Sequence, residues 1–558
     1  MRAKNEVKEK SKWFRKIIII AIFIGLIAVI INLAPNYIRK EITGKTNVII
    51  NNNNVTESMK FDVFIDENEI VYMSTKDIAN FFDEDIFYDN VYDQIITTSD
   101  TKIATLKLDE KEMYVNSSRV KIYGSAIEKD DNFYLPFSEM KDVYNVEVNY
   151  IEESNIVTID SLNREQKKGN ASKDISVKYQ PTVFSKTIDK VEKADSVVVI
   201  KELENGWKQV RTSLGEIGYT KDVTNIYTVR EEMENTKQIE GKVSLVWDYY
   251  SEYASAPDRT GTTIKGVNVV SPAFAILDDD ADGDLYTNIG EAGKKYIKWA
   301  HNNGYKVWPM ISNNSEKAVT SEVLNDYKLR EKLISNIVNL AIEYNLDGIN
   351  IDFEYMNMDD KDVFSRFIIE LAPRLKEYGK VLSVDVTAPD GSEDWSMCYD
   401  RNKIGQVADY IIFMAYDQYG ISSPKEGTTA GADWVEVNIK KFIGTQEEVP
   451  ADKLILGMPF YTRLWKETGN SVTSGVVTMK YIDSKIPSNV EKVWDEDLKQ
   501  YYVEYQEDGI TYKMWLEEET SIKAKFELMK KYNLAGAAYW QKDFEKSTIW
   551  DIVAEEIK

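Results

Sequence analysis

Three polar side chains that can hold or pass protons recur at alternate positions in one short segment of the chain. These are Asn350, Asp352 and Glu354. Side chains of a β-strand alternate between its two faces, so the three share one face, while apolar residues at 349, 351 and 353 share the other. Two carboxylates that are two residues apart repel each other, which favours retention of a proton on one of them near neutral pH. The spacing therefore predicts a general acid on this strand.

Whether these side chains can act as acids on a substrate depends on where the strand lies in the fold. In a parallel barrel the apolar face would pack under the outer helices and the polar face would point inward. Glu354 would then lie at the carboxyl end of the strand, where barrel active sites are found. The same spacing is also compatible with a solvated acidic strand beside an Asp-Gly turn. Residue spacing alone leaves both interpretations open.

Four segments of the chain resemble the motifs of glycoside hydrolase family 18, the chitinase-like hydrolases. DGINIDFE at 347–354 is similar to the family's Asp-Gly-x-Asp-x-Asp-x-Glu pattern on the fourth barrel strand, with Asp347 and Gly348 as its first signature residues. The others follow in the family's order: FMAYD at 413–417, GMPFYTR at 457–463 and GAAYW at 536–540. The resemblance implies a (β/α)8 TIM barrel, which we place at 229–558.

The resemblance also implies a retaining mechanism in which the substrate's 2-acetamido group replaces a protein nucleophile. Glu354 would protonate the glycosidic oxygen and later activate water, and Asp352 would accept the acetamido N–H and stabilise positive charge. Tyr416 would hydrogen-bond the acetamido oxygen, with Asp417 lining the same pocket and Trp540 forming its apolar floor. The remaining substrate contacts implied by the matching segments are Met414, Tyr461, Arg463 and Asn350. No metal or organic cofactor is implied.

One position departs from the family pattern. Asn350 stands where an aspartate is usual, although relatives from spores and cell envelopes often resemble this chain there. An amide cannot take a second negative charge, so proton sharing between position 350 and Asp352 is in doubt. Activity is still expected, because the acid Glu354 and the acetamido partner Asp352 remain.

Composition narrows the classes of partner. A chain of 558 residues exceeds one ordinary domain, so three or four domains are expected. The formal net charge of −24 argues against nucleic acid and favours a neutral polysaccharide. The single cysteine, Cys398, excludes an internal disulfide, and the single histidine, His301, leaves no cluster for zinc or copper. Both are expected to be ordinary packing or surface residues.

The amino terminus predicts a membrane anchor at 1–40. Residues 17–34 are apolar except for Asn32, and about 18 residues at ~1.5 Å each cross most of the hydrocarbon layer. Seven Lys or Arg precede this run against two Glu, which places the amino terminus in the cytoplasm and the later domains outside the cell. A cleaved signal peptide is the alternative, but no small-x-small cleavage site follows the run. The predicted location is therefore the cell membrane, with a single pass.

Two smaller domains are predicted between the anchor and the barrel. After a polar linker at 41–60, residues 61–161 contain two α+β copies offset by 62 residues, each a strand, a helix and a hairpin. They resemble the amino-terminal repeat of some copper amine oxidases, without copper ligands. The expected role is either that of a rigid spacer or that of a wall-binding module. After a second linker at 162–172, Gly-Trp-x-x-Val and Gly-x-x-Gly-Tyr elements resemble a bacterial SH3-like β-barrel at 172–228, a class that often binds cell-wall peptides.

Eight strands are predicted in the barrel, with an α+β insertion at about 466–530 that deepens the groove. The strands are 243–247, 266–270, 306–311, 348–353, 382–387, 410–415, 454–459 and 536–540. The function predicted for the whole is hydrolysis of a β-linked N-acetylglucosamine polymer, either peptidoglycan or chitin, with peptidoglycan favoured by the envelope modules. A catalytically silent sugar-binding protein is the alternative of another class, and retention of Glu354 argues against it.

Overall fold

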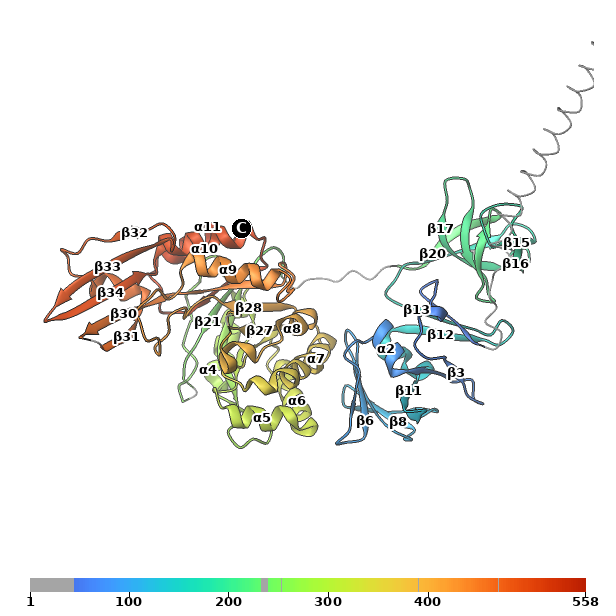
Figure 1. Ribbon diagram of the computed structural model, residues 1–558, viewed down its shortest axis with the longest axis horizontal. Helices are drawn as coiled ribbons and strands as arrows, with labels where there is room; N and C mark the ends of the chain where they lie inside the picture. The colour runs from blue at the N-terminus through green and yellow to red at the C-terminus, as the bar shows by residue number, and fades with distance from the viewer. Residues whose placement is uncertain (1–44, 232–238, 252, 390, 470) are drawn as a thin grey trace, which may run out of the picture. The chain divides into compact units, whose positions relative to one another are not determined.

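The computed structural model describes residues 45–231, 239–251, 253–389, 391–469 and 471–558 (Figure 1). The described part of the chain divides into two compact units, residues 45–97 with 104–231 and residues 98–103 with the described residues from 239 to 558. No helix among the described residues combines the length and apolar composition that crossing a bilayer requires. The predicted anchor at 17–34 lies outside the described residues.

The repeat contains two copies of a strand, a helix and a hairpin, as predicted. The first copy comprises β4 (Val71–Ser74), α2 (Thr75–Phe81), β5 (Phe87–Asp89) and β6 (Gln94–Thr98). The second comprises β11 (Asn132–Pro136), η3 (Phe137–Met140), α3 (Lys141–Tyr144), β12 (Val146–Ile151) and β13 (Ile156–Ser161). Strands β4 and β11 pair antiparallel with Met73 opposite Leu135. These residues are one repeat apart, so a local two-fold axis relates the two strands.

The remaining elements of this domain complete its sheets. They are β1 (Asn47–Ile50), β2 (Asn53–Asn54), η2 (Thr56–Ser58), β3 (Phe64–Ile65), β7 (Ile103–Lys107), β8 (Glu112–Val115), β9 (Ser118–Lys121) and β10 (Ile127–Lys129). The linker predicted at 41–60 is therefore wrong from residue 47 onward, because β1 pairs parallel with β13 and is buried at Val48. Asn51 and Asn52 have φ values of 49° and 66° and turn the chain into β2. Asparagine adopts this left-handed backbone more readily than most residues, so a polar run forms a hairpin turn.

A seven-stranded antiparallel sheet follows, in the order β16-β15-β19-β18-β17-β14-β20. Its strands are β14 (Gln166–Ala171), β15 (Ile175–Lys178), β16 (Thr187–Val191), β17 (Ser196–Glu202), β18 (Lys208–Arg211), β19 (Ile217–Thr220) and β20 (Val223–Arg230). The linker predicted at 162–172 is wrong because β14 pairs with both β17 and β20. Gly169 permits this pairing, since a Cβ there would lie 2.5 Å from Val223 Cγ1. The likeness of this sheet to an SH3 domain stays a prediction.

A buried ion pair joins the repeat to the seven-stranded sheet. Both terminal nitrogens of the Arg211 guanidinium donate to the carboxylate of Asp160 on β13, with 2.9 Å between Nη1 and Oδ1. Each of the two side chains is only 7% exposed. Gly215 lies against the same strand, where an added Cβ would come within 2.8 Å of Ile156. The two domains therefore share a packed junction inside one compact unit.

The second unit is a closed barrel of eight parallel strands, which confirms the predicted TIM barrel. The strands are β21 (Val243–Asp248), β22 (Val269–Leu277), β24 (Lys306–Val307) continued as β25 (Met310–Ser312), β26 (Gly348–Asp352), β27 (Val381–Val386), β28 (Tyr410–Met414), β29 (Leu454–Pro459) and β35 (Gly536–Trp540). Pairing of β21 with both β22 and β35 closes the ring.

Helices surround the barrel in Figure 1. They are α4 (Gly290–Asn302), α5 (Lys317–Asn325), α6 (Tyr327–Glu343), α7 (Lys361–Glu377), α8 (Arg401–Val407), α9 (Ala432–Ile443), α10 (Glu519–Lys531) and α11 (Ile549–Glu556). Shorter elements are β23 (Leu285–Thr287), η4 (Met358–Asp360) and the π-helical η5 (Glu393–Met397). No helix occurs between β21 and β22 in the part of that connection that the structure describes.

Two predicted strands differ from those observed. The strand predicted at 266–270 begins at residue 269 and runs to 277. Gly266 belongs to the preceding turn, with φ of 77°, and a Cβ added there would lie 2.6 Å from the backbone of Ala554. Pro309 interrupts the third strand between β24 and β25, because proline lacks the N–H that a sheet ladder requires.

The insertion after β29 is an antiparallel sheet with a 3-10 segment, and not the α+β fold expected. Its elements are β30 (Tyr461–Thr468), β31 (Ser471–Thr478), η6 (Met479–Lys485), β32 (Val493–Asp495), β33 (Gln500–Glu507) and β34 (Ile510–Leu516), with sheet order β31-β30-β34-β33-β32. Helix α10, most of which falls inside the predicted range of 466–530, follows this sheet and buries Ile522 and Phe526 in the barrel core.

Gly348 offers a test of barrel packing. A Cβ at this position would lie 2.7 Å from both Trp308 Cδ1 and the Val381 carbonyl oxygen, and backbone cannot move aside cheaply. Gly348→Ala is expected to destabilise the barrel by about 1–3 kcal/mol through overpacking, measured as a lower melting temperature in calorimetry of the full chain. The matched control Gly475→Ala, with no atom within 4 Å of the added Cβ, should melt like the parent. Equal melting of both variants would contradict the packing described.

Candidate active site

A cavity of about 170 Å³ opens at the carboxyl ends of the barrel strands. It brings together seven of the residues predicted from the sequence: Asp352, Glu354, Met414, Tyr416, Asp417, Tyr461 and Trp540. Three further residues line it that the sequence reasoning missed: Asp385, Thr387 and Trp395. The predicted residues Arg463 and Asn350 support the cavity from behind its wall, and Asp347 and Gly348 lie at the other end of β26.

The two faces of β26 have the environments that alternation predicts. Ile349 and Ile351 are fully buried in the core between the strands and the outer helices. Phe353 stacks on Phe364 and Phe367 of α7, with ring centroids 6.1 and 5.6 Å apart. Packing of this apolar face fixes the rotation of the strand, which turns the polar face inward.

Two side chains from other elements hold the backbone at Glu354. The amide of Asn313 accepts from Glu354 N and donates to Glu354 O, both at 3.0 Å. The hydroxyl of Tyr399 donates to the carbonyl oxygen of Phe353 at 2.7 Å. Glu354 therefore leaves the strand in a fixed direction, and its side chain enters the cavity.

Asn350 organises the floor of the site through its amide. Its Nδ2 donates to Asp385 Oδ1 at 2.7 Å and to Ser383 Oγ at 3.1 Å. Its Oδ1 accepts from the Trp247 indole at 2.9 Å and from Ser271 Oγ at 3.2 Å. An ionised aspartate at position 350 could donate neither bond, and a protonated one could donate only one of them. The carboxyl group that the usual family pattern carries at this position has a counterpart on the neighbouring strand β27, at Asp385.

Burial determines the protonation of the three carboxyl groups in the cavity. It raises the pKa of Asp352 to about 7. Burial, together with the charges of Asp352 and Asp417, holds the pKa of Glu354 well above its usual value. Burial and the charge of Asp352 also hold the pKa of Asp385 well above its usual range, against the hydrogen bond from Asn350. Near neutral pH the three groups therefore carry fewer than three negative charges, and their protons belong to the set.

Asp352 has a feature that a polar ligand would satisfy. The side chain is 6% exposed, and its Oδ1 is buried without a hydrogen-bond partner among the described residues. An unpaired buried oxygen is unfavourable unless it receives a donor. The atom is therefore available to an N–H or O–H group of a molecule in the cavity.

The opposite wall comes from β28 and β30. The Tyr461 hydroxyl donates to Asp417 Oδ1 at 2.9 Å, and Arg463 Nη2 approaches the same oxygen at 3.4 Å. The rings of Tyr416 and Tyr461 meet edge to face with centroids 6.2 Å apart. These contacts position Asp417, whose backbone has a left-handed φ of 56°. Arg463 thus helps to position Asp417 and does not itself line the cavity.

Aromatic rings form the sides of the cavity. Trp540 meets Trp247 edge to face at 5.8 Å and lies 5.7 Å from the ring of Tyr249. Trp395 meets the exposed Tyr355 at 6.4 Å. Flat apolar rings beside carboxyl groups suit the two kinds of surface that a sugar ring presents.

The signature residues Asp347 and Gly348 lie at the amino end of β26. Asp347 accepts from His301 Nε2 and Lys306 Nζ, each at 2.9 Å, and from Val307 N at 3.0 Å. Burial alone would raise its pKa, but these partners lower it below the usual value. His301 therefore has a structural role, and Cys398 is a buried free thiol. No group of three or more His, Cys, Asp or Glu among the described residues is placed to hold a metal ion.

The missed residue Asp385 left a signal in the sequence. Ser383, Asp385 and Thr387 alternate on the predicted strand 382–387 as the polar residues of β26 do, so the same period-two argument would have found them. Asn313 directly follows the third barrel strand, as Glu354 follows the fourth. No comparable signal marks Tyr399 or Trp395, because they lie in the connection after β27.

The raised pKa of Asp385 predicts a pH-dependent effect on stability. A carboxyl group whose folded-state pKa is raised contributes most to stability below its unfolded pKa of about 4, and this contribution is lost as the pH rises toward the folded value. Asp385→Asn removes the loss and keeps an acceptor for Asn350. The melting temperature of the variant relative to the parent is therefore expected to rise as the pH is raised from 5 to 8. A constant difference would refute the electrostatic description, and Asp497→Asn, an exposed aspartate, is the matched control.

Comparison with known proteins assigns this barrel to a family. The sequence model of Glycosyl hydrolases family 18 matches residues 245–545, and that of the Copper amine oxidase N-terminal domain matches residues 49–159. The uncharacterized glycosylase YvbX of Bacillus subtilis (strain 168) is 27% identical over 303 residues, which cover 48% of this chain and 80% of that protein. The cortical fragment-lytic enzyme of Bacillus anthracis is 25% identical over 251 residues, which cover 44% of this chain and only 57% of that protein.

A solved structure agrees on the fold. The chitinase from Chromobacterium violaceum ATCC 12472 superposes with a TM-score of 0.50 at 24% identity, covering 57% of this chain and 98% of that one. The family model spans more than half of the 558 residues, including every cavity-lining residue. The protein is therefore a glycoside hydrolase and belongs to family 18 of the glycosyl hydrolases.

Proposed function

We propose that the protein hydrolyses β-linked N-acetylglucosamine-containing polysaccharide with retention of configuration, through assistance by the substrate's acetamido group. The observation that carries this proposal is the buried Asp352 oxygen without a donor, in one cavity with Glu354 and Tyr416. An acetamido N–H is a donor of the required kind. By accepting from it, Asp352 would hold the carbonyl oxygen of the acetamido group toward the anomeric carbon of the sugar.

Glu354 is the general acid in this reaction. Its raised pKa keeps a proton on the side chain near neutral pH, and that proton passes to the glycosidic oxygen as the C1–O bond breaks. The acetamido oxygen forms the new bond to C1, which gives an oxazolinium ion, while the hydroxyl of Tyr416 hydrogen-bonds that oxygen. Glu354 as carboxylate then takes a proton from water, whose oxygen attacks C1 and reopens the ring.

Asp385 completes the acid–base set on this proposal. Asn350 cannot hold charge, but it joins Asp385 to the floor at 2.7 Å. As positive charge develops on the acetamido group, Asp352 becomes fully ionised, and protonated Asp385 beneath it limits the repulsion. The role left open by Asn350 is thus taken by the carboxyl group on β27.

Bacterial peptidoglycan is the proposed polymer. A relative described as a cortical fragment-lytic enzyme supports an envelope polymer, and the predicted anchor and SH3-like region would hold the barrel beside a wall. Chitin and chitooligosaccharides are the alternative substrates, and they carry the same acetamido group. The SH3-like region would bind wall peptides, and the repeat would serve as a spacer or a second wall contact.

Replacement of the acid tests the mechanism. Glu354→Gln preserves shape and cannot cycle a proton, so we expect glycan binding to persist and kcat to fall by at least about a hundredfold. The matched control Glu555→Gln, on the exposed surface of α11, should retain parental kcat. Hydrolysis by Glu354→Gln at the parental rate would remove Glu354 from the acid role.

The same assay separates substrate assistance from a protein nucleophile. Glycans whose acetamido group is replaced by a hydroxyl or a free amine at the cleaved sugar should not turn over. A thiazoline mimic of the oxazolinium ion should inhibit. Efficient cleavage of a polymer without acetamido groups would eliminate this mechanism.

The proposed location is the cell membrane, with the catalytic domain outside. The basic residues before the apolar run orient the chain, so the full-length protein is expected to fractionate with membranes. Protease added to protoplasts should release the barrel into the medium. Recovery of protein in the medium without residues 1–34 would instead identify a cleaved signal peptide.

A further inference from the structure

A second concavity of about 610 Å³ adjoins the candidate active site in the same unit. The insertion forms one side through β31 and η6, and the segment after β35 forms the other, with Tyr249 at one end. The residues on which the argument rests are Tyr249, Lys480, Tyr481, Lys485, Lys542 and Asp543, and we call this concavity the lysine groove. The ring of Tyr249 lies 5.7 Å from Trp540, which lines the catalytic cavity. A glycan bound over Trp540 would therefore continue past Tyr249 into the groove.

The charge of the lysine groove is opposite to that of the whole chain. Three lysines and one aspartate line it, in a protein of formal net charge −24. The carboxylate of Asp543 is already engaged by Arg259, with Nη2–Oδ2 at 2.8 Å and Nη1–Oδ1 at 3.1 Å, and by Lys542 at 2.8 Å. Burial alone would raise the pKa of Asp543, but these hydrogen bonds lower it to about 2. Lys542 also pairs with Glu545 at 2.6 Å, so its ammonium group is already paired with carboxylates of the protein.

Two ammonium groups remain for a ligand. Lys480 donates to the carbonyl oxygen of Asp543 at 2.5 Å and lies over the Tyr481 ring, 5.2 Å from its centroid. Lys485 is exposed on the same 3-10 segment. Within the residues that the structure describes, neither lysine forms an ion pair with a carboxylate at 4.0 Å or less. Tyr249 and Tyr481 beside them are 46% and 56% exposed, which adds flat faces for sugar rings.

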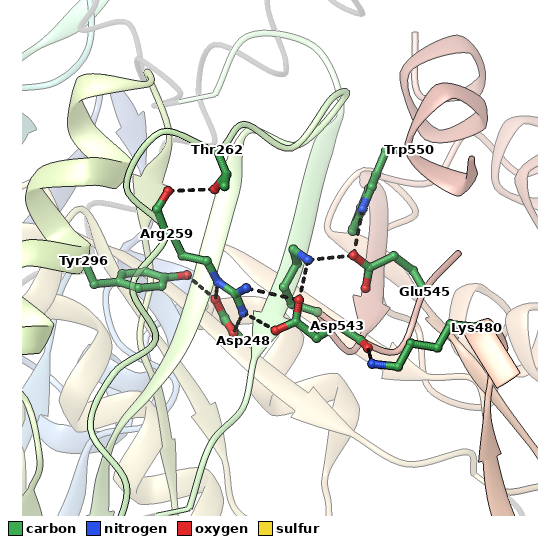
Figure 2. Close-up of polar contacts among 9 residues, drawn as sticks. Asp248, Arg259, Thr262, Tyr296, Lys480, Asp543, Glu545 and Trp550 are labelled. Atoms are coloured by element: carbon green, nitrogen blue, oxygen red, sulfur yellow. Dashed lines mark hydrogen bonds and ion pairs between the residues drawn. The ribbon is translucent and has the colours of Figure 1, made fainter. Parts of the chain in front are cut away.

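The groove is held in shape before a ligand arrives. Figure 2 shows Arg259 between Asp248 and Asp543, with the Tyr296 hydroxyl on Asp248 and Lys480 on the backbone of Asp543. Arg259 binds Asp248 through Nε–Oδ2 at 2.9 Å and Nη2–Oδ1 at 2.7 Å. The network connects the loop after β21, helix α4 and the segment after β35. A wall fixed in this way loses little entropy on binding.

We propose that the lysine groove binds carboxylate groups carried by the glycan, and so selects peptidoglycan strands over neutral chitin. This inference rests on the proposed function, because it takes the same chain of sugars to lie in both concavities. In peptidoglycan every second sugar bears a lactyl group. Its carboxylate is free on strands without stem peptides and is amide-linked to the peptide elsewhere, where the peptide supplies the carboxylates. Chitin bears neither. Lys480 and Lys485 supply the complementary charge, and Tyr249 and Tyr481 supply the stacking surfaces.

Binding measured without turnover tests the inference. In a Glu354→Gln background, calorimetry would compare two ligands of equal length, an N-acetylglucosamine oligomer and a peptide-free strand of alternating N-acetylglucosamine and N-acetylmuramic acid. Adding Lys480→Gln and Lys485→Gln should weaken binding of the acidic strand about two- to twentyfold, the range of two exposed ion pairs. Binding of the neutral oligomer should change by less than about twofold, and ~1 M salt should reduce the difference, since screening weakens exposed pairs.

A second double variant controls for net charge. Lys466→Gln with Lys523→Gln makes the same change of charge at exposed positions on β30 and α10, outside the groove, and should leave both ligands unaffected. Equal loss of both ligands in the Lys480 and Lys485 variant, or no loss of the acidic strand, would overturn the carboxylate assignment. Hydrolysis by the parent protein is measured separately. Failure to cleave either glycan would refute the proposed function, while the binding comparison still decides the role of the groove.

Discussion

Removal of three carboxyl groups from water at one end of a barrel is the constraint on which the site depends. Charged carboxylates are unfavourable in such a place, so the groups keep protons that solvated carboxylates would lose. Asn350 makes the arrangement possible, because an amide can donate to Asp385 and accept from Trp247 at once. Burial of the three groups together raises their pKa values, so protons stay bound to them near neutral pH.

The same constraint accounts for the distribution of positive charge around the site. Arginine and lysine appear one layer further out, where Arg463 approaches Asp417 and Arg259 binds Asp248 and Asp543. A cation inside the cavity would lower the pKa of Glu354 and remove its proton. Cations in the outer layer can fix loops and neutralise carboxylates at the rim without that effect. Among the described residues, the cavity itself is lined by carboxyl and aromatic groups, and the basic residues lie outside that lining.

Much of the barrel could be predicted from the sequence, because four segments resemble the motifs of a known barrel family and alternation distinguishes the two faces of one strand. Residues 349–354 identified both faces of β26, and the aromatic and acidic motifs identified most of the cavity. Asp385 was missed because it lies on a strand without a familiar motif, although its alternation with Ser383 and Thr387 was visible. Tyr399 could not be predicted, since only the folded chain brings its hydroxyl to the Phe353 carbonyl.

Polar composition was the least reliable guide. The asparagines at 51 and 52 and the glycine at 169 suggested linkers, yet each meets a geometric need of a sheet: a left-handed turn in one case and close contact between strands in the other. Position 47–54 and β14 thus belong to folded domains. Polar composition indicates exposure to water. Asn51 and Asn52, however, adopt a left-handed turn, and Gly169 leaves room for a neighbouring strand because it has no side chain.

The buried pair of Arg211 and Asp160 has a consequence for how such proteins can be assembled from parts. Loss of one partner from a buried ion pair is unfavourable by about 3–5 kcal/mol, because the other charge stays buried. The repeat and the seven-stranded sheet each hold one half of this pair. Separation of the two domains would expose both charges to water, together with the packed surface around them, where Gly215 lies against Ile156. When such proteins are recombined, naturally or by engineering, the two domains are therefore expected to be transferred together, and a junction between exchanged parts is better placed elsewhere in the chain.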